Sequence, residues 1–473
     1  MPQTRQVYLL DPKDLSPETI AVTFAKTSRS PQRFCEIAAE LSDEKSAEFN
    51  EKWVVGYGHA SVAEHAVLHL AVENISRLAV EALESCRLAS YTEKSTRYQK
   101  WSTDAFYTPE NLTEPGLKAD YQSVVKALFK AYQEALPAVK AVVENEYPLQ
   151  DHESAPAWER RIRSAYVDIC RYYLPAAALA NVGVTINARA LEHSLTKMLS
   201  HPLAEVRAIG AELKQVSQAN VPTLVKYADQ NSYLESSRKN FRQVNLEFEL
   251  PAETPELCHL IECSPGLEEN ILAAALYSQG TASYAQTLQR VQQASQAQKQ
   301  SWADMLLGSL GSFDIPLREL EYGDFTFEVC LDQGGYFELK RHRMMTQTPQ
   351  RFTPALGYAL PLGICQAGLE EHFHQAMQLA GQAYQQLSVW DADAASYVLP
   401  NAYNRRVLLK LNFRALLHLL NLRSAANAHF SIRRLSQAMA AEVRARLPLL
   451  GQYLRVNPEE DADSITQAYF RRV

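Results

Sequence analysis

The segment Asn187-Ala188-Arg189-Ala190-Leu191-Glu192-His193 decides how the chain is organised, because its pattern returns as Asn412-Phe413-Arg414-Ala415-Leu416-Leu417-His418. Leu174-Pro175 precedes the first copy at the same distance as Leu399-Pro400 precedes the second, and equivalent residues are separated by 225 positions. A repeat of about 230 residues is no solenoid unit, because each copy can bury a core alone. We therefore predict two tandem domains of one fold, residues 1–235 and 263–473, joined by a polar, proline-containing linker at 236–262.

The composition is that of a globular protein. Hydrophobic residues make up 47% of the chain and charged residues 21%, which excludes a disordered chain. No apolar run is long enough to span a membrane, and the first residues lack a signal-peptide pattern, so we expect a cytoplasmic protein. The net charge of -7 offers no general attraction to nucleic acid, and the seven cysteines contain no C-x-x-C pair. The sequence therefore predicts no metal site, and any anion must be held by local arginines.

The order of apolar segments predicts an α+β fold in each copy. Residues 66–72 and 325–331 have the alternation of half-buried strands, and Glu64 and Glu321 stand just before them. Residues 184–199 and 408–421 have apolar spacing near that of a helix, which would place each Arg/His pair of the repeat on one helix face. The first copy also carries about thirty additional residues, within 101–161.

Two segments carry residues typical of a binding site. Arg341-His342-Arg343 gathers guanidinium groups that suit phosphate oxygens, although a solvated basic loop has the same composition. Glu93, Ser95 and Arg97 alternate, so in an extended chain all three point the same way and could bind a pyrimidine edge, a sugar and a phosphate. A polar surface loop is the alternative interpretation of that alternation.

In motif order and spacing, the chain resembles the flavin-dependent thymidylate synthases. In the first copy the resemblance rests on the segments at 58–65, 72–77, 90–98 and 187–189, which read GHASVAEH, VENISR, SYTEKSTRY and NAR. In the second copy it rests on Arg341-His342-Arg343, Asn412-Phe413-Arg414 and Asn421-Leu422-Arg423. Together the two copies cover nearly the whole chain.

The resemblance implies a fold, an assembly and a reaction. Each copy would be an antiparallel sheet with helices, and a homodimer of the chain would form a pseudo-tetramer. FAD and dUMP would bind where subunits meet. The reaction would methylate dUMP to dTMP with methylenetetrahydrofolate and NADPH.

The family pattern can be carried over residue by residue. In the first copy, Ser61 and Glu64 match positions near FAD, and Glu93, Ser95 and Arg97 match the substrate loop. Arg171 matches an arginine that helps to hold dUMP. The arginine-histidine pair of the triplet is replaced in this copy by Ser85 and Cys86, and Met198 replaces a substrate-binding arginine.

The second copy departs from the family in complementary places. Arg341, His342 and Arg343 match the triplet, and Arg423 matches the helix arginine that the first copy lacks. Ser396 replaces the arginine before Leu-Pro, and residues 347–354 contain no Glu-x-Ser-x-Arg loop. Each copy thus keeps roughly what the other has lost, and we therefore expect composite sites that combine residues from both copies. At a site that no longer binds phosphate, clustered arginines repel one another, so their replacement costs no stability.

The resemblance gives each residue of the composite site a role. Ser95 and Arg423 are the expected catalytic residues. The expected substrate-binding residues are Glu93, Ser95, Arg97, Arg171, Arg341 and Arg423. The expected FAD-binding residues are Ser61, Glu64, Asn187, Arg189, Arg341, His342, Arg343, Asn412, Arg414 and His418. A structural interpretation stays open for the repeated Asn and Arg residues and for His418, as buried groups that fix a helix.

Two alternatives to thymidylate synthesis stay open. The altered loop of the second copy and the insertion within 101–161 allow a flavoenzyme acting on another uridine-type nucleotide. The incomplete triplet of the first copy allows a nucleotide-binding protein without catalytic activity.

Overall fold

The computed structural model describes residues 6–28, 30–56, 59–97, 100–246 and 255–471. Gly58 and Tyr98 of the motifs above, and residues 247–254 of the predicted linker, therefore lie outside the described residues. The chain forms two compact units. Unit 1 contains Met1–Ser95, Phe106–Pro115 and Ala178–Pro251, and unit 2 contains Thr96–Ala105, Gly116–Ala177 and Ala252–Val473. Part of the first repeat thus belongs to the same compact unit as the second.

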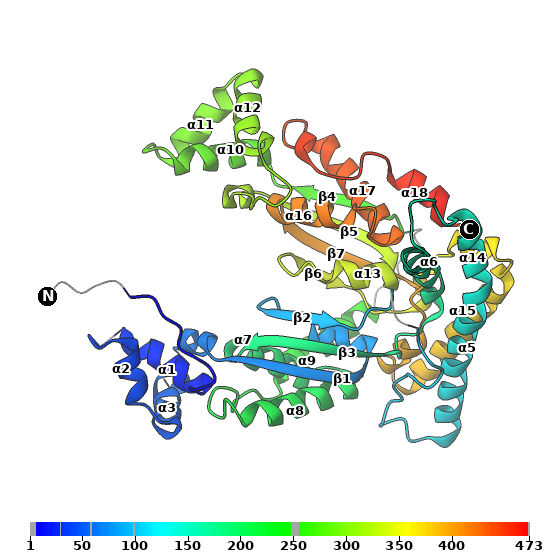
Figure 1. Cartoon of the computed structure of the whole chain (residues 1–473), viewed down its shortest axis with the longest axis horizontal. Helices are drawn as coiled ribbons and strands as arrows, with labels where there is room; N and C mark the ends of the chain where they lie inside the picture. The colour runs from blue at the N-terminus through cyan, green and yellow to red at the C-terminus, as the bar shows by residue number, and fades with distance from the viewer. Residues whose placement is uncertain (1–5, 29, 57–58, 98–99, 247–254, 472–473) are drawn as a thin grey trace. The chain divides into compact units, whose positions relative to one another are not determined.

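Unit 1 is built on a three-stranded antiparallel sheet of order β1-β3-β2 (Figure 1). The strands are β1 Val67–Ser76, β2 Ala89–Glu93 and β3 Leu179–Asn187. The register between β1 and β3 shifts between Val72 and Ile75, where Asn74 has a positive φ of 57°. Asparagine tolerates this left-handed conformation better than most residues, and such a bulge bends the strand where it ends.

The helices of unit 1 surround this sheet. Helices α4, α7 and α8 pack together, and α4 and α7 contact the strands of the sheet. Three further helices, α1 to α3, form the N-terminal part of the unit. The bounds are α1 Pro17–Thr27, α2 Phe34–Ala39, α3 Asp43–Phe49, α4 Arg77–Leu83, α7 Ala188–Leu199, α8 Ala204–Gln218 and α9 Ser232–Leu246.

Unit 2 contains a four-stranded antiparallel sheet of order β4-β5-β7-β6. The strands are β4 Cys258–Cys263, β5 Asp324–Asp332, β6 Thr346–Pro349 and β7 Asn404–Asn412. In β7 the residues Val407, Leu409 and Leu411 are buried in the main core, whereas Leu408 and Lys410 are exposed. This alternation follows from the two-residue period of a strand and leaves one face of the sheet covered by helices.

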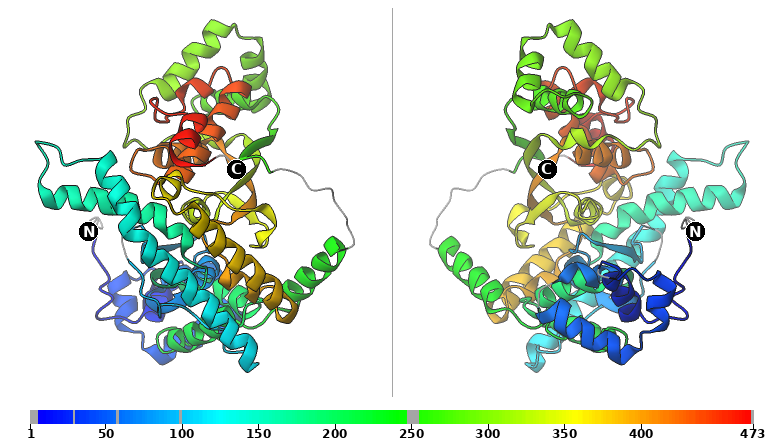
Figure 2. Two further views of the ribbon diagram at one scale, coloured as in Figure 1. Left: turned by 90° about the vertical axis from the view of Figure 1, so that its right-hand side faces the viewer. Right: turned by 90° about the vertical axis from the view of Figure 1, so that its left-hand side faces the viewer.

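The helices of unit 2 include the long pair α5 and α6 from the first repeat. Helices α10, α11 and α12 gather at one end of the unit (Figure 2). The bounds are α5 Pro115–Glu146, α6 Ala155–Cys170, α10 Leu267–Ser278, α11 Tyr284–Gln293, α12 Gln296–Ala303, α13 Gln333–Leu339, α14 Leu362–Gln366, α15 Glu370–Trp390, α16 Phe413–Arg423, α17 Phe430–Arg446 and α18 Ala462–Tyr469.

The α+β class is confirmed, and β1 and β5 confirm the two predicted strands. Two expectations about secondary structure were wrong. The predicted helices at 184–199 and 408–421 begin only at α7 and α16, because their first residues complete the alternating strands β3 and β7. Residues 93–97 are not one extended run, since β2 ends at Glu93 and a turn contains Arg97. The predicted linker 236–262 contains the end of α9 and most of β4, while the domain boundaries themselves stay a prediction.

Both units contain a buried hydrogen bond between a serine and a carboxylate at the end of a strand, but the two residue types occupy opposite positions. In unit 1, Ser76 caps α4 and donates its hydroxyl to Glu205, 2.5 Å away, at the start of α8. In unit 2, Asp332 caps α13 and accepts a hydrogen bond from Ser431 at the start of α17. A carboxylate and a hydroxyl thus meet at both positions, although the carboxylate belongs to the strand end in one unit and to the helix in the other.

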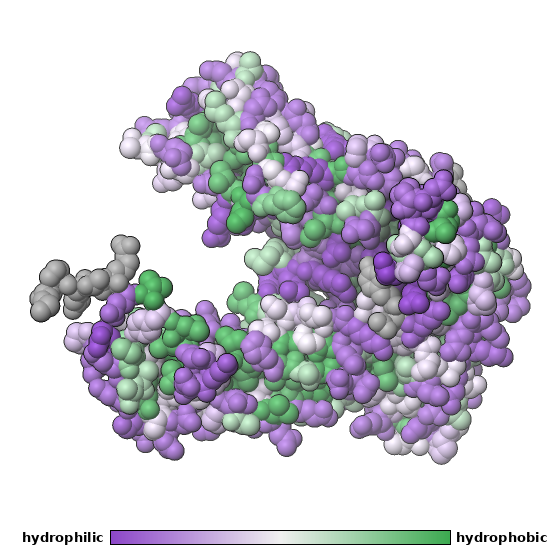
Figure 3. Space-filling view, viewed as in Figure 1, coloured by the Kyte–Doolittle hydropathy of each residue, from purple (hydrophilic) through white to green (hydrophobic). Residues whose placement is uncertain are grey.

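The face shown in Figure 3 is mainly hydrophilic, with apolar residues gathered in separate patches. In unit 2 the exposed apolar side chains include Met305, Phe313, Ile315 and Tyr322. Among the described residues, no helix is both long enough and apolar enough to cross a membrane.

Candidate functional site

Three arginines and two carboxylates form a cluster within unit 2. Arg97 and Arg171 belong to the first repeat, and Arg423 ends helix α16 of the second. Asp168 lies in the last turn of α6, and Glu338 lies in α13. The sequence pattern predicts the three arginines but neither carboxylate. The cluster therefore combines side chains from both repeats inside one compact unit.

The strongest ion pair of the cluster joins Arg97 to Asp168. The Arg97 Nε donates to the two carboxylate oxygens at 2.9 and 3.0 Å, and its Nη2 donates to Oδ2 at 2.7 Å. The Nη2 also donates to the carbonyl of Asn427 at 3.1 Å. Burial raises the pKa of Asp168, while the neighbouring guanidinium groups of Arg171 and Arg97 oppose that rise. This fork geometry fixes the orientation of Arg97.

Glu338 connects the arginines of the two repeats. Its Oε2 accepts a hydrogen bond from Arg423 Nη1 at 3.0 Å, and its Oε1 lies 3.8 Å from Arg97 and 4.0 Å from Arg171. Oε1 is buried and accepts no hydrogen bond from the described residues. Such an acceptor costs free energy unless a ligand or water supplies a donor.

His342 is held as a neutral acceptor. Arg423 Nε donates to its Nε2 at 2.8 Å, and its ring packs edge-on against His418 at 5.6 Å between centroids. Burial, together with Arg423, His418 and Arg343, lowers the pKa of His342 to about 3. Burial also lowers the pKa of His418, with a further contribution from Arg423. Both imidazoles therefore stay uncharged at neutral pH.

Arg171 is almost completely buried, with 2% of its surface exposed. Its guanidinium donates to the carbonyl of Gly334 at 3.1 Å and to the hydroxyl of Thr96 at 3.3 Å. His429 is also buried, and its Nδ1 accepts a hydrogen bond from the amide of Ser431. Burial lowers the pKa of His429 well below its ordinary value, and Arg171 and Arg97 lower it further.

The charges of the cluster do not cancel. Three guanidinium groups face two carboxylates, and the neighbouring histidines are neutral, which leaves one positive charge in excess. Arg341 is exposed and Arg343 is partly exposed on the loop that follows α13, so they add cationic groups beside the cluster. This arrangement can attract and orient an anion.

The remaining predicted residues of unit 2 lie at the start of α16. Asn412 caps this helix, since its side chain accepts a hydrogen bond from the amide of Ala415. Arg414 donates to Glu321 at 2.8 Å and to the carbonyl of Pro316 at 2.9 Å. These contacts of Asn412 and Arg414 hold the start of α16 in place, which is the structural role that the sequence left open for both residues.

The predicted residues of unit 1 repeat part of this pattern. Asn187 caps α7, and Arg189 pairs with Glu64 at the surface. Ser61 is exposed, and Ser95 is partly exposed. The side chain of Glu93 is 2% exposed and forms a buried ion pair with Arg77, the first residue of α4. Glu93 is thus neutralised within its own unit.

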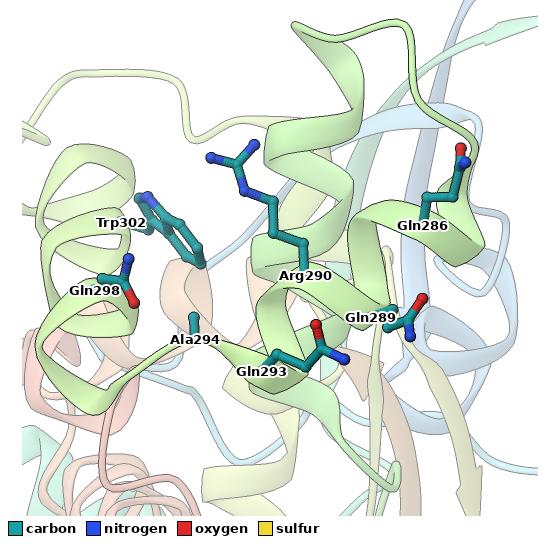
Figure 4. Close-up of a pocket in the computed structure, with 7 residues that line it drawn as sticks. All are labelled: Gln286, Gln289, Arg290, Gln293, Ala294, Gln298 and Trp302. Atoms are coloured by element: carbon teal, nitrogen blue, oxygen red, sulfur yellow. The ribbon is translucent and has the colours of Figure 1, made fainter.

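Two pockets lie in unit 2. The larger, about 590 Å³, borders the cluster at Arg97 and Asp168. The smaller, about 340 Å³, lies between α11 and α12, where the Arg290 guanidinium lies 5.9 Å from the centre of the Trp302 ring (Figure 4). The side chains around that pair are glutamines 286, 289, 293 and 298, and none of the predicted site residues lines this smaller pocket.

The family described as "Thymidylate synthase complementing protein" matches residues 10–223 and 259–449. The chain belongs to this family. The resemblance to flavin-dependent thymidylate synthases is thereby confirmed, and the two matched regions are consistent with tandem copies.

Relatives of two kinds are similar to the chain. The "UPF0159 protein" of Chlamydia muridarum is 31% identical over 448 residues, covering 90% of this chain and 83% of that protein. The "Flavin-dependent thymidylate synthase" of Sulfolobus acidocaldarius is 31% identical over 232 residues, covering 48% of this chain and 77% of that protein. A solved flavin-dependent thymidylate synthase of Helicobacter pylori, "complexed with FAD and dUMP", is 19% identical with a TM-score of 0.31, covering 46% of this chain and 96% of that chain.

Proposed function

We propose that the chain is an FAD-dependent enzyme that methylates dUMP to dTMP with methylenetetrahydrofolate and NADPH. The observation that carries this proposal is the cluster in which Arg97 and Arg171 of the first repeat meet Arg423, His342 and Glu338 of the second. Membership of the family supports the reaction class. In this proposal a homodimer of the chain provides the pseudo-tetramer, with one composite site for each chain.

The arginines would hold the nucleotide by its phosphate. The cluster alone has one positive charge in excess, and the guanidinium groups of Arg341 and Arg343 on the neighbouring loop are further donors suited to a phosphate dianion. Asp168 is then a positioning residue, because its bidentate contact holds Arg97 in one orientation. The buried guanidinium of Arg171 needs no reorganisation when the anion arrives.

The polar groups around Glu338 would read the base. A pyrimidine imide N–H is the kind of donor that the buried Oε1 of Glu338 lacks. Arg423 would donate to a ring carbonyl, where developing negative charge is stabilised by a fixed cation. Neutral His342 holds Arg423 at 2.8 Å without adding a competing charge.

The residues around the loop after α13 fit a flavin dinucleotide. Exposed Arg341 and partly exposed Arg343 are donors suited to its diphosphate, and their guanidinium groups would bind and orient it. When bound, the flavin supplies the redox chemistry. Asn412 and Arg414 would support this region through the start of α16, as Asn187 and Arg189 do in unit 1.

The structure also motivates a second candidate. Arg97 is already engaged by Asp168, and Glu338 places a negative charge among the arginines, so a ligand with fewer phosphate charges is compatible with the cluster. The alternative is therefore a flavoenzyme for another uridine-type nucleotide, or a nucleotide-binding protein without turnover.

The test is a flavin spectrum followed by a turnover assay. The full chain is purified with added FAD, and dTMP formation is measured by mass spectrometry with dUMP, methylenetetrahydrofolate and NADPH. We expect bound flavin, dTMP formation, and a loss of at least about 100-fold in the Arg97→Met variant. Arg163→Met changes an exposed arginine on α6 and should leave turnover unchanged. A chain that binds FAD and dUMP but forms no dTMP would refute the proposed reaction and favour the second candidate.

A further inference from the structure

The larger pocket of unit 2 contains groups that the proposed reaction does not use. Its walls come from α5, α6, α14, α17, α18 and the loop before α17. It shares Arg97 and Asp168 with the arginine cluster but is not lined by Arg171, Glu338 or Arg423. A volume of about 590 Å³ lies within the range of small-molecule sites in proteins.

Two sides of this pocket are lined by aliphatic and aromatic side chains. Val143 of α5 and Ile162 of α6 are buried and line one side. Phe430 and Tyr469 line another, with parallel rings whose centroids are 4.9 Å apart. Aliphatic and aromatic surfaces of this kind bind planar apolar groups by removing them from water.

A buried arginine in the same pocket points to an acidic group on the ligand. The side chain of Arg433 is 7% exposed, and its Nη1 donates to the carbonyl of Ala426 at 2.8 Å. Its Nη2 lies 3.3 Å from Glu460, and its guanidinium lies 5.1 Å from the centre of the Tyr469 ring. The Nε of Arg433 has no hydrogen-bond acceptor among the described residues. A buried donor without an acceptor is costly, so an anionic oxygen is the group that this position lacks.

The charged side chains that line the pocket are held in ion pairs. Its cations are Arg97, Arg161 and Arg433, against the carboxylates Glu146 and Asp168. Two of the cations have further carboxylate partners outside the lining, so their positions are fixed rather than free to turn to solvent. Each of the three cations thus has a carboxylate partner, and the pocket offers fixed guanidinium groups beside apolar walls without an excess of positive charge.

We propose that this pocket binds a small aromatic anion, whose acidic oxygen accepts a hydrogen bond from Arg433 Nε while its ring packs against Phe430 and Tyr469. The site adjoins the proposed nucleotide site at Arg97 and Asp168, and it does not depend on the proposed reaction. Because both sites touch the Arg97–Asp168 ion pair, a bound ligand at either site would influence the other.

The probe for this site is 8-anilinonaphthalene-1-sulfonate, an aromatic sulfonate whose fluorescence rises in an apolar environment. It is titrated against the full chain with and without saturating FAD and dUMP. We expect saturable binding at one site per chain. Ala165→Trp fills the pocket from α6 and should weaken binding at least about tenfold, whereas Ala141→Trp makes the same change at an exposed position of α5 and should not.

Two further variants separate the proposal from loss of folding. Arg433→Lys keeps the charge but removes the Nε donor, so it should also weaken binding at least about tenfold. If circular dichroism shows that Ala165→Trp is unfolded, Ala468→Trp at the pocket rim replaces it. Binding without saturation, equal binding by the filled and control variants, or competitive displacement of the probe by dUMP would each overturn the proposal. Failure of dUMP itself to bind would refute the proposed function and leave this site intact.

Discussion

Replacement of Asp168 by asparagine tests the arginine cluster most directly as a structural unit. The carboxylate is buried and accepts three hydrogen bonds from Arg97, of 2.9, 3.0 and 2.7 Å. The Arg171 Nε lies 4.0 Å away. The variant keeps the side-chain shape and one acceptor oxygen but removes the negative charge. Two guanidinium groups then lose most of the charge that compensates them.

The size of the effect follows from burial. Removing one partner of a buried ion pair costs about 3–5 kcal/mol, because the remaining charge stays desolvated without a counter-charge. Asparagine retains one acceptor, so we expect a loss of about 3 kcal/mol for Asp168→Asn. For a urea dependence of about 3 kcal/mol per M, this loss lowers the unfolding midpoint by about 1 M.

The assay is urea unfolding followed by circular dichroism, with Asp229→Asn as the control. Asp229 accepts a hydrogen bond of 2.8 Å from Lys214, but its side chain is 73% exposed. Solvent screens such a pair, so the same substitution should change the midpoint by less than about a third as much. Equal midpoints for wild type and Asp168→Asn, or equal losses in both variants, would refute the claim that burial makes this ion pair important.

Three further predictions concern stability. Because the pKa of His342 is about 3 in the folded chain and about 6.5 when unfolded, only the unfolded chain gains a proton as the pH falls from 7 to 5. Protonation of His342 in the unfolded chain should therefore lower the free energy of unfolding by about 2 kcal/mol between pH 7 and pH 5. In the His342→Gln variant, the free energy of unfolding should fall by about 2 kcal/mol less over the same pH range, measured by urea unfolding. Asn412→Ala removes the cap of α16 and should cost about 1 kcal/mol by thermal melting; an unchanged melting temperature would contradict the capping role. A Cβ at Gly335 would lie 2.6 Å from Ser431 Oγ, so Gly335→Ala should destabilise the chain by about 1–3 kcal/mol. Gly116→Ala is the control, because nothing lies within 4 Å of a Cβ at that position. Equal melting temperatures for the two variants would contradict the predicted clash.

The sequence was sufficient to predict the fold class and the strands β1 and β5. It misplaced the starts of α7 and α16, because apolar residues at the ends of β3 and β7 continue into the helices without a break in composition. Asn187 and Asn412 were the available signals. Each is a favourable helix cap, and a cap marks the boundary that spacing alone obscured.

The candidate site was predictable only for its cations. Arginines in a family motif are visible in a sequence, whereas Asp168 and Glu338 look like surface carboxylates three residues ahead of Arg171 and Arg341. They become parts of the cluster because packing within unit 2 buries them against residues far away in the chain. The same holds for Arg77, whose buried contact with Glu93 depends on strand pairing that composition does not reveal.

The strand β4 was missed for a different reason. Prolines and polar residues on its N-terminal side indicated a linker, and the six-residue strand is short. Its burial pattern exposes half of its residues, since β4 forms the edge of the sheet, and within the strand only Leu260 is well buried. The alternation of apolar and polar residues is weak in such an edge strand, so it is easily missed when strands are predicted from the sequence.

The most direct test of one composite site made by both repeats is calorimetric titration of dUMP into the FAD-loaded chain. We predict one dUMP bound per chain, with binding lost in Arg97→Met of the first repeat and equally in Arg423→Met of the second. Arg163→Met should bind as the wild type does. Two dUMP molecules per chain, or wild-type affinity in either of the first two variants, would contradict the composite site.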